Sequence, residues 1–144
     1  MSFLDSMSIS ASALTATRLR MDVITENMAN SNTTRTENGD PYRRKYVVFQ
    51  EKTNDNAFAE FFNKAQTAPG GVRVLQIGTD MSEFKYDYNP SHPDADENGY
   101  VRLPNVEVVQ EMVDMMSAYR AYEANITALN TFKDMAMKTF ELGR

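Results

Sequence analysis

Residues 105–143 read "NVEVVQEMVDMMSAYRAYEANITALNTFKDMAMKTFELG", and this stretch decides the fold. It holds no Gly or Pro between Val106 and Leu142, and Gly143 closes it, which is typical of one continuous helix. About 35 helical residues would span about 50 Å at a rise of about 1.5 Å per residue. Such a helix far exceeds the usual three or four turns, so we expect it to pair with another helix.

Apolar side chains recur at heptad spacing along this stretch. One series steps by seven and comprises Met115, Tyr122, Leu129 and Ala136. A second series comprises Met112, Tyr119 and Ile126, and Lys133 then interrupts it. Their alternating steps of three and four predict the seam of a coiled coil. A further apolar stripe beside them comprises Val109, Val113 and Met116.

The other end of the chain, from residue 3 to about residue 30, carries the same periodicity. Four apolar residues recur there every seven positions: Met7, Leu14, Met21 and Met28. Ile24 lies three positions after Met21 on the same stripe. The economical arrangement pairs this N-terminal helix with the C-terminal one, because each then covers the apolar stripe of the other.

The middle of the chain is rich in proline and glycine and contains four strand-like segments. They are "KYVVFQ" (45–50), "GVRVLQI" (71–77), "EFKYDY" (83–88) and "GYVRL" (99–103). Alternation of apolar and polar residues in the second and third indicates strands. Between the first two segments, Phe58, Phe61 and Phe62 form an aromatic cluster that we expect to make one helical turn or to pack against the strands.

We therefore expect a mainly α fold with a small β-rich insert. The expected parts are an N-terminal helix within residues 1–34, a β-rich and loop insert in residues 35–104, and a long C-terminal helix within residues 105–144. The terminal helices pair as a coiled coil, and the β region projects sideways between them.

Composition excludes several function classes. The 144 residues carry a net charge of −5 and a pI of about 4.9, which argues against nucleic-acid binding. The chain has no cysteine, and therefore no disulfide, thiolate metal site or cysteine nucleophile. No run approaches the roughly 20 apolar residues of a membrane span, and the N-terminus lacks the features of a cleaved signal peptide. We expect no direct membrane insertion.

No set of residues predicts catalysis. His92 is interpreted as a turn residue, although a small hydrolase that uses it would be a third class of function. The run "DADENG" (94–99) matches the first half of a calcium loop, but the twelfth position is Asn105 instead of a bidentate carboxylate. The basic cluster 43–45 is interpreted as a solvated strand edge. We expect no metal, no cofactor and no enzyme activity.

Three asparagines mark the end of the first helix. The stretch "ITENMANSN" (24–32) holds Asn27, Asn30 and Asn32 at the point where the apolar pattern stops. Asparagine tolerates left-handed backbone geometry, and its amide bonds to nearby main-chain groups. A buried asparagine also fixes the register of paired helices. We interpret the three residues as a joint at the end of the helix.

Both ends of the chain resemble bacterial flagellar axial proteins. The stretch "ISASALTATRLRMDVITENMANSNTTRTENGDPYRRK" (9–45) is similar to their N-terminal signature, a helix that ends in "NxANxNT". Residues 105–143 are similar to their C-terminal helix. The stretch "YNPSHPDADENGYVRLPNV" (88–106) resembles one typical of proximal members of the flagellar basal-body rod family. Residues 51–82 carry none of the resemblance.

The resemblance implies a structural subunit of the flagellar proximal rod that polymerises helically, transmits torque and lines the export conduit. The implied partners are copies of itself, other rod subunits, and components of the basal-body rings and export gate. The implied location is the periplasmic part of the basal body, reached by type III export without a cleaved signal peptide. The open alternative is a non-polymerising coiled-coil adaptor or export chaperone, which would tolerate loss of residues 1–25.

Twelve residues are the expected coiled-coil and subunit-interface positions. They are Met7, Leu14, Met21, Ile24, Met28, Met112, Met115, Tyr119, Tyr122, Ile126, Leu129 and Phe132. The apolar surface of both helices is wider than one partner helix covers. We therefore expect the stripe of Val109, Val113 and Met116 to contact neighbouring subunits.

Overall fold

The computed structural model describes residues 3–52 and 70–143. Within them lie two helices, α1 (Phe3–Ala29) and α3 (Val108–Leu142). Four strands lie between the helices in sequence: β1 (Lys45–Glu51), β2 (Val72–Thr79), β3 (Lys85–Tyr88) and β4 (Tyr100–Leu103). The two predicted helices and all four predicted strands are confirmed. The aromatic cluster of Phe58, Phe61 and Phe62 lies outside the described residues.

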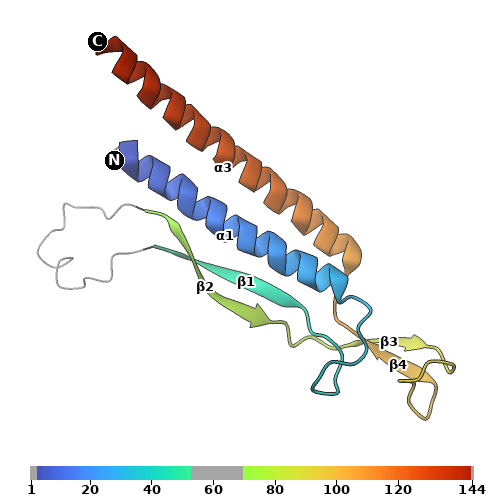
Figure 1. The fold of residues 1–144 in the computed structure, drawn as a ribbon. Coiled ribbons are helices and arrows are strands. Elements are labelled where there is room, and N and C mark those ends of the chain that lie inside the picture. The colour runs from blue at the N-terminus through green and yellow to red at the C-terminus, as the bar shows by residue number, and fades with distance from the viewer. Residues whose placement is uncertain (1–2, 53–69, 144) are drawn as a thin grey trace, which may run out of the picture.

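The elements form three layers along an elongated molecule. Helices α1 and α3 lie side by side and antiparallel, and the β1–β2 hairpin lies along α1 on the side away from α3 (Figure 1). Helix α1 packs against α3, β1 and β2, whereas no strand in the described ranges packs against α3. Of the two described hairpins, β3–β4 extends beyond the helix pair as the sequence suggested, whereas β1–β2 lies against α1. Helix α1 needs cover on two faces, since Val23 and Ile24, adjacent in sequence, are both buried.

Helix α3 meets α1 through one stripe of buried and half-buried residues. The stripe steps alternately by four and three and comprises Glu111, Met115, Ala118, Tyr122, Asn125, Leu129, Phe132 and Ala136. Its members include the predicted series that begins at Met115, but the predicted second series of Met112, Tyr119 and Ile126 lies exposed in the subunit. The small side chain of Ala118, 1% exposed, permits close approach of the helices at this register.

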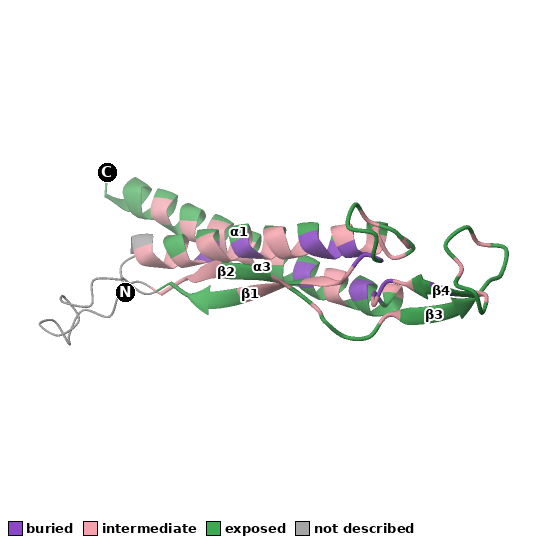
Figure 2. Cartoon of the chain, turned by 90° about the horizontal axis from the view of Figure 1, so that it is seen from below, coloured by how far each residue is buried: buried purple, intermediate pink, exposed green. Residues whose placement is uncertain are grey.

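Two short antiparallel hairpins complete the fold. In the first, Lys45 pairs with Thr79 and Glu51 with Val72, and a bulge leaves Leu75 without a partner residue. In the second, residues 85–88 pair with residues 100–103. The strands of the first hairpin mix half-buried and exposed residues, and those of the second are exposed except for Val101 and Leu103 (Figure 2).

The core is small and lies mainly at the end of the molecule where α1 ends and α3 begins. Its members there are Val23, Ile24, Tyr42, Val101 and Val106, together with the buried prolines 41 and 104. Buried side chains become fewer toward the opposite end, where the last turns of α3 are exposed (Figure 2). The junction is therefore the part of the molecule that holds the layers together.

We predict that Ala118→Leu destabilises the subunit by about 1–3 kcal/mol, because three extra carbon atoms overfill a fully buried position between the two helices. Urea denaturation followed by circular dichroism measures this change. The neighbouring exposed substitution Ser117→Leu is the matched control, and it should change the free energy of unfolding by less than about 0.5 kcal/mol. Equal effects of the two substitutions would contradict close packing at Ala118.

Candidate functional site

Asn27 is the centre of a buried polar joint. Its side chain is 1% exposed and uses its full hydrogen-bonding capacity. Its Nδ2 donates to the carbonyl oxygen of Lys45 (2.8 Å) and to Oε2 of Glu111 (3.1 Å). Its Oδ1 accepts from the hydroxyl of Tyr42 (3.0 Å) and from the backbone N–H of Lys45 (2.9 Å). One side chain thus connects α1, the start of β1 and α3.

The carboxylate of Glu111 is the charged member of this joint. It is 0% exposed, and Nε of Arg44 donates to its Oε1 at 2.6 Å. The same guanidinium reaches Oδ2 of Asp114 one turn further along α3 (3.5 Å), and Arg20 of α1 lies 3.9 Å from the other oxygen of Asp114. The pairing compensates for the desolvation of Glu111, which would otherwise cost several kcal/mol.

The basic cluster 43–45 is not the solvated strand edge that its sequence suggested. Arg44 pairs with Glu111, and Lys45 forms an ion pair with Glu26 of α1. The guanidinium of Arg43 lies 4.2 Å from the centre of the Phe84 ring. That interpretation is wrong because a buried glutamate of α3 and a half-buried glutamate of α1 face the start of β1 and pair with Arg44 and Lys45.

A second asparagine extends the joint toward the hairpins. Oδ1 of Asn105 accepts from the backbone N–H of Arg44 (2.8 Å), and its Nδ2 donates to the carbonyl oxygen of Asp80 (3.0 Å). The backbone N–H of Asp80 in turn donates to the carbonyl oxygen of Arg44 (2.8 Å). The segment that precedes α3 is thereby fixed to the residue before β1 and to the residue after β2, which lie side by side at one end of the hairpin.

The other two predicted joint residues have smaller roles. Nδ2 of Asn30 caps the carbonyl oxygen of Glu26 at the end of α1 (2.9 Å), and its Oδ1 accepts from Thr33 (3.2 Å). Asn32 is exposed. Among the described residues, positive φ occurs only at Gly39 and Gly99, so none of the three asparagines adopts the left-handed geometry that asparagine tolerates. Side-chain capping ends this helix instead.

The side chains in the predicted turn around His92 form hydrogen bonds that hold the loop in shape. Nδ1 of His92 accepts from the backbone N–H of Asp94 (3.1 Å), and Oδ1 of Asp96 accepts from the backbone N–H groups of Asn98 and Tyr100. The carboxylate of Asp94 accepts from Thr34 at 2.8 Å, which ties this loop to the segment after α1.

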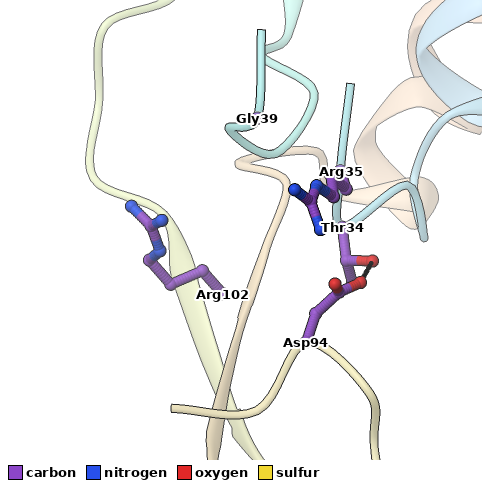
Figure 3. Close-up of a pocket in the computed structure, with 5 residues that line it drawn as sticks. All are labelled: Thr34, Arg35, Gly39, Asp94 and Arg102. Atoms are coloured by element: carbon purple, nitrogen blue, oxygen red, sulfur yellow. Dashed lines mark hydrogen bonds between the residues drawn. The ribbon is translucent and has the colours of Figure 1, made fainter. Parts of the chain in front are cut away.

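A polar recess of about 190 Å³ lies beside this contact. Figure 3 shows the Thr34–Asp94 hydrogen bond, with Arg35 and Arg102 lining the recess from different segments. Among residues 3–52 and 70–143, no group of three or more His, Asp or Glu side chains is arranged to hold a metal ion.

The outward face of α3 is a second candidate site. It carries a stripe of five large apolar side chains, each between 48% and 70% exposed: Val109, Met112, Val113, Met116 and Tyr119. We call these five residues the outward stripe. Contiguous exposed apolar side chains on a folded subunit mark an interaction surface.

The structure divides the predicted interface residues between the two faces. Ile24 is buried, and Met7, Leu14, Met21 and Met28 are half-buried in α1. On α3, Met115, Tyr122, Leu129 and Phe132 are half-buried toward α1. Met112 and Tyr119 belong to the outward stripe, and Ile126, 37% exposed, lies two turns beyond it.

Sequence reasoning missed the partners of Asn27, namely Tyr42, the backbone of Lys45 and Glu111, and it missed the ion pair of Arg44 with Glu111. One signal was present, because Glu111 lies four positions before Met115 and seven before Ala118, at the spacing of the inner stripe. A search restricted to apolar residues passes over it. Tyr42 and Arg44 lie in a loop and at a strand start, where no periodicity reports burial.

We predict that Asn27→Ala destabilises the subunit by about 3 kcal/mol, because it leaves the hydroxyl of Tyr42, the backbone of Lys45 and the carboxylate of Glu111 short of partners. Chemical denaturation at neutral pH measures the loss. Asn32→Ala, at an exposed position in the turn that follows α1, is the matched control and should be close to neutral. A neutral Asn27→Ala would show that the joint carries no stability.

The joint also has a titratable tyrosine. Burial, followed by the negative charges of Glu26 and Glu111, raises the pKa of Tyr42 to about 12. The folded state thus holds the proton more tightly than the unfolded state, whose tyrosine pKa is about 10. The contribution to stability is complete below about pH 10 and is lost as the pH rises toward about 12.

We therefore predict that Tyr42→Phe flattens the loss of stability between about pH 10 and pH 12, although it lowers stability at neutral pH by removing the hydrogen bond to Asn27. Urea midpoints across this range measure the effect. Tyr86→Phe, at an exposed position, should leave the alkaline slope of the wild-type chain in place. The same slope in Tyr42→Phe would contradict the assignment.

Comparisons with known proteins match both helical ends. The family model described as "Flagella basal body rod protein" matches residues 7–35, which include Asn27. The model described as "Flagellar basal body rod FlgEFG protein C-terminal" matches residues 97–142, which include Glu111 and the outward stripe. No helix in the described ranges is both long and apolar enough to span a membrane.

Relatives of similar length match nearly the whole chain. The flagellar basal-body rod protein FlgC of Bacillus subtilis is 47% identical over 96% of this chain and 97% of its own. The proteins of the same name from Salmonella typhimurium and from Escherichia coli O6:H1 are 44% and 42% identical, over the full length of both chains in each case. The chain therefore belongs to the flagellar basal-body rod protein family, together with the FlgC proteins, and is a structural, non-enzymatic component of the flagellar basal body.

Proposed function

We propose that this subunit polymerises helically into the proximal part of the flagellar rod, transmits torque and contributes to the wall of the export conduit. The observation that carries the proposal is the outward stripe of α3, which α1 does not cover. Burial of apolar surface releases about 25 cal/mol per Å², so repeated contacts of this kind hold a polymer together. The family membership supports the rod as the place of assembly.

Torque transmission requires that a load on one layer reaches the others. The joint at Asn27 and Glu111 supports this role, because it links α1, the start of β1 and α3 by hydrogen bonds and an ion pair. A fully satisfied buried network resists shear, since any sliding of one helix breaks several polar contacts at once. The proposed partners are copies of this chain, other rod subunits, and ring and export-gate components.

The location that we propose is the periplasmic part of the basal body, reached by export without a cleaved signal peptide. An adaptor or chaperone that never polymerises is the alternative. Deletion of residues 1–25 does not separate the two functions, because α1 is the middle layer and its loss removes the support of both α3 and the β1–β2 hairpin. A substitution on the outward stripe is the sharper test.

We predict that Met116→Asp lowers the amount of subunit in purified basal bodies by about tenfold or more. An unpaired carboxylate in a closed apolar contact costs more than the roughly 1.4 kcal/mol that a factor of ten represents. Labelled chain in a strain that lacks its own copy, followed by electron microscopy and immunoblotting of basal bodies, provides the measurement. Motility should fall in parallel.

Ala121→Asp is the matched control, since Ala121 is exposed on the same helix and lies off the outward stripe. Both purified variants should unfold at the urea concentration of the wild-type chain. Normal incorporation of Met116→Asp would refute the role of this stripe. Intact rods that lack the chain altogether would favour the adaptor.

A further inference from the structure

The outward stripe of α3 needs a surface to receive it. We propose that the groove between α1 and β2 of a second copy of this chain receives it. This inference rests on the proposed function, and it names one contact within the polymer.

The groove is open and has a volume of about 570 Å³. Its apolar walls are formed by Ala16 and Leu19 of α1 and by Val72 and Val74 of β2. Val72 and Val74 share one face of the hairpin because side chains alternate along a strand. Helix α1 covers only part of that face.

The uncovered part of the face carries large apolar side chains. Val74 pairs across the sheet with Phe49, and Val47 pairs with Ile77, so Phe49 and Ile77 lie on the same face as the valines. Phe49 and Ile77 remain 40% and 47% exposed. The hairpin therefore offers apolar surface for a second helix beside α1.

The outward stripe has the spacing that such a groove binds. Its members follow Val109 at intervals of three, four, seven and ten residues, so they project from one side of α3. Anchors at these intervals are typical of a helix that lies in an apolar groove. Two of the five are methionines, whose flexible side chains adapt to an irregular surface.

The charges that line the groove favour an acidic partner. The groove is lined by Arg18, Lys52 and Arg73 with one acid, Asp22, which gives three positive and one negative charge, a net of +2. The exposed charges of α3 next to the stripe, those of Arg120 and Glu123, cancel, so the stripe brings no net like charge to the groove. This basic groove stands out in a chain whose net charge is −5. A second copy, which is acidic overall, is therefore attracted as it approaches the groove.

Both surfaces belong to every copy and lie on different layers of it (Figure 1). A contact between them is heterologous, so each copy has one stripe to insert and one groove to fill. Repetition of a heterologous contact that does not close into a ring produces a helical assembly. A contact between two outward stripes would be isologous and would end at a dimer.

Cysteine cross-linking tests this contact, because the chain has no cysteine of its own. Thr15→Cys marks the groove, and Ser117→Cys marks α3 next to Met116 without altering the outward stripe. The two variants carry different tags and are expressed together in cells that lack the wild-type chain. Purified basal bodies are treated with a short bismaleimide and blotted for both tags. Ser91→Cys, exposed in the β3–β4 loop, replaces Ser117→Cys in the control pair.

The Thr15–Ser117 pair should give a cross-linked dimer that carries both tags. The Thr15–Ser91 pair should give no such dimer. Basal bodies that contain both chains without this dimer would overturn the inference and leave the proposed function standing. The same holds for a dimer formed by Ser117→Cys alone, or for Thr15→Cys joined to a different rod protein. Basal bodies that contain neither chain would overturn the inference and the proposed function together.

Discussion

A buried carboxylate in the first turn of α3 constrains the layers around it. Glu111 has no exposure to solvent, and an unpaired charge there would cost several kcal/mol. Its partners are Arg44, from the segment that begins β1, and Asn27, from the last turns of α1. The carboxylate is therefore stable only when both helices and the hairpin are in place, and the three layers form as one unit at this junction.

Burial decreases with distance from the junction. The first turns of α3 are fixed by hydrogen bonds and an ion pair, whereas Met137, Phe140 and Leu142 near its end are highly exposed. Since α3 has 35 residues and α1 has 27, the longer helix runs past its partner at this end. A subunit built in this way is rigid where its layers join and offers apolar side chains elsewhere to neighbours.

The sequence predicts the elements better than it predicts their contacts. The bounds of α3 follow from the absence of Gly and Pro over residues 107–142, and the strands follow from alternation, because both signals are local. The partners of Asn27 lie 15 to 84 residues away in sequence, so no local pattern reports them. The inner stripe of α3 was assigned partly to Met112 because periodicity counts apolar residues, and the buried position next to it is a glutamate.

Which of the neighbouring residues Glu111 and Met112 faces α1 decides which side of α3 remains available for another contact. The side chains of residues 111 and 112 point about 100° apart around the helix. When one of them faces α1, the other therefore points away from it. Over residues 109–119, burial alone would favour the face that carries Met112, Met116 and Tyr119, because the face toward α1 has a glutamate and an alanine among its members there. The polar contacts of Glu111 with Asn27 and Arg44 are satisfied in only one orientation, and they turn the face of Glu111 toward α1. The joint thereby keeps the outward stripe uncovered within the subunit, where another chain can bury it.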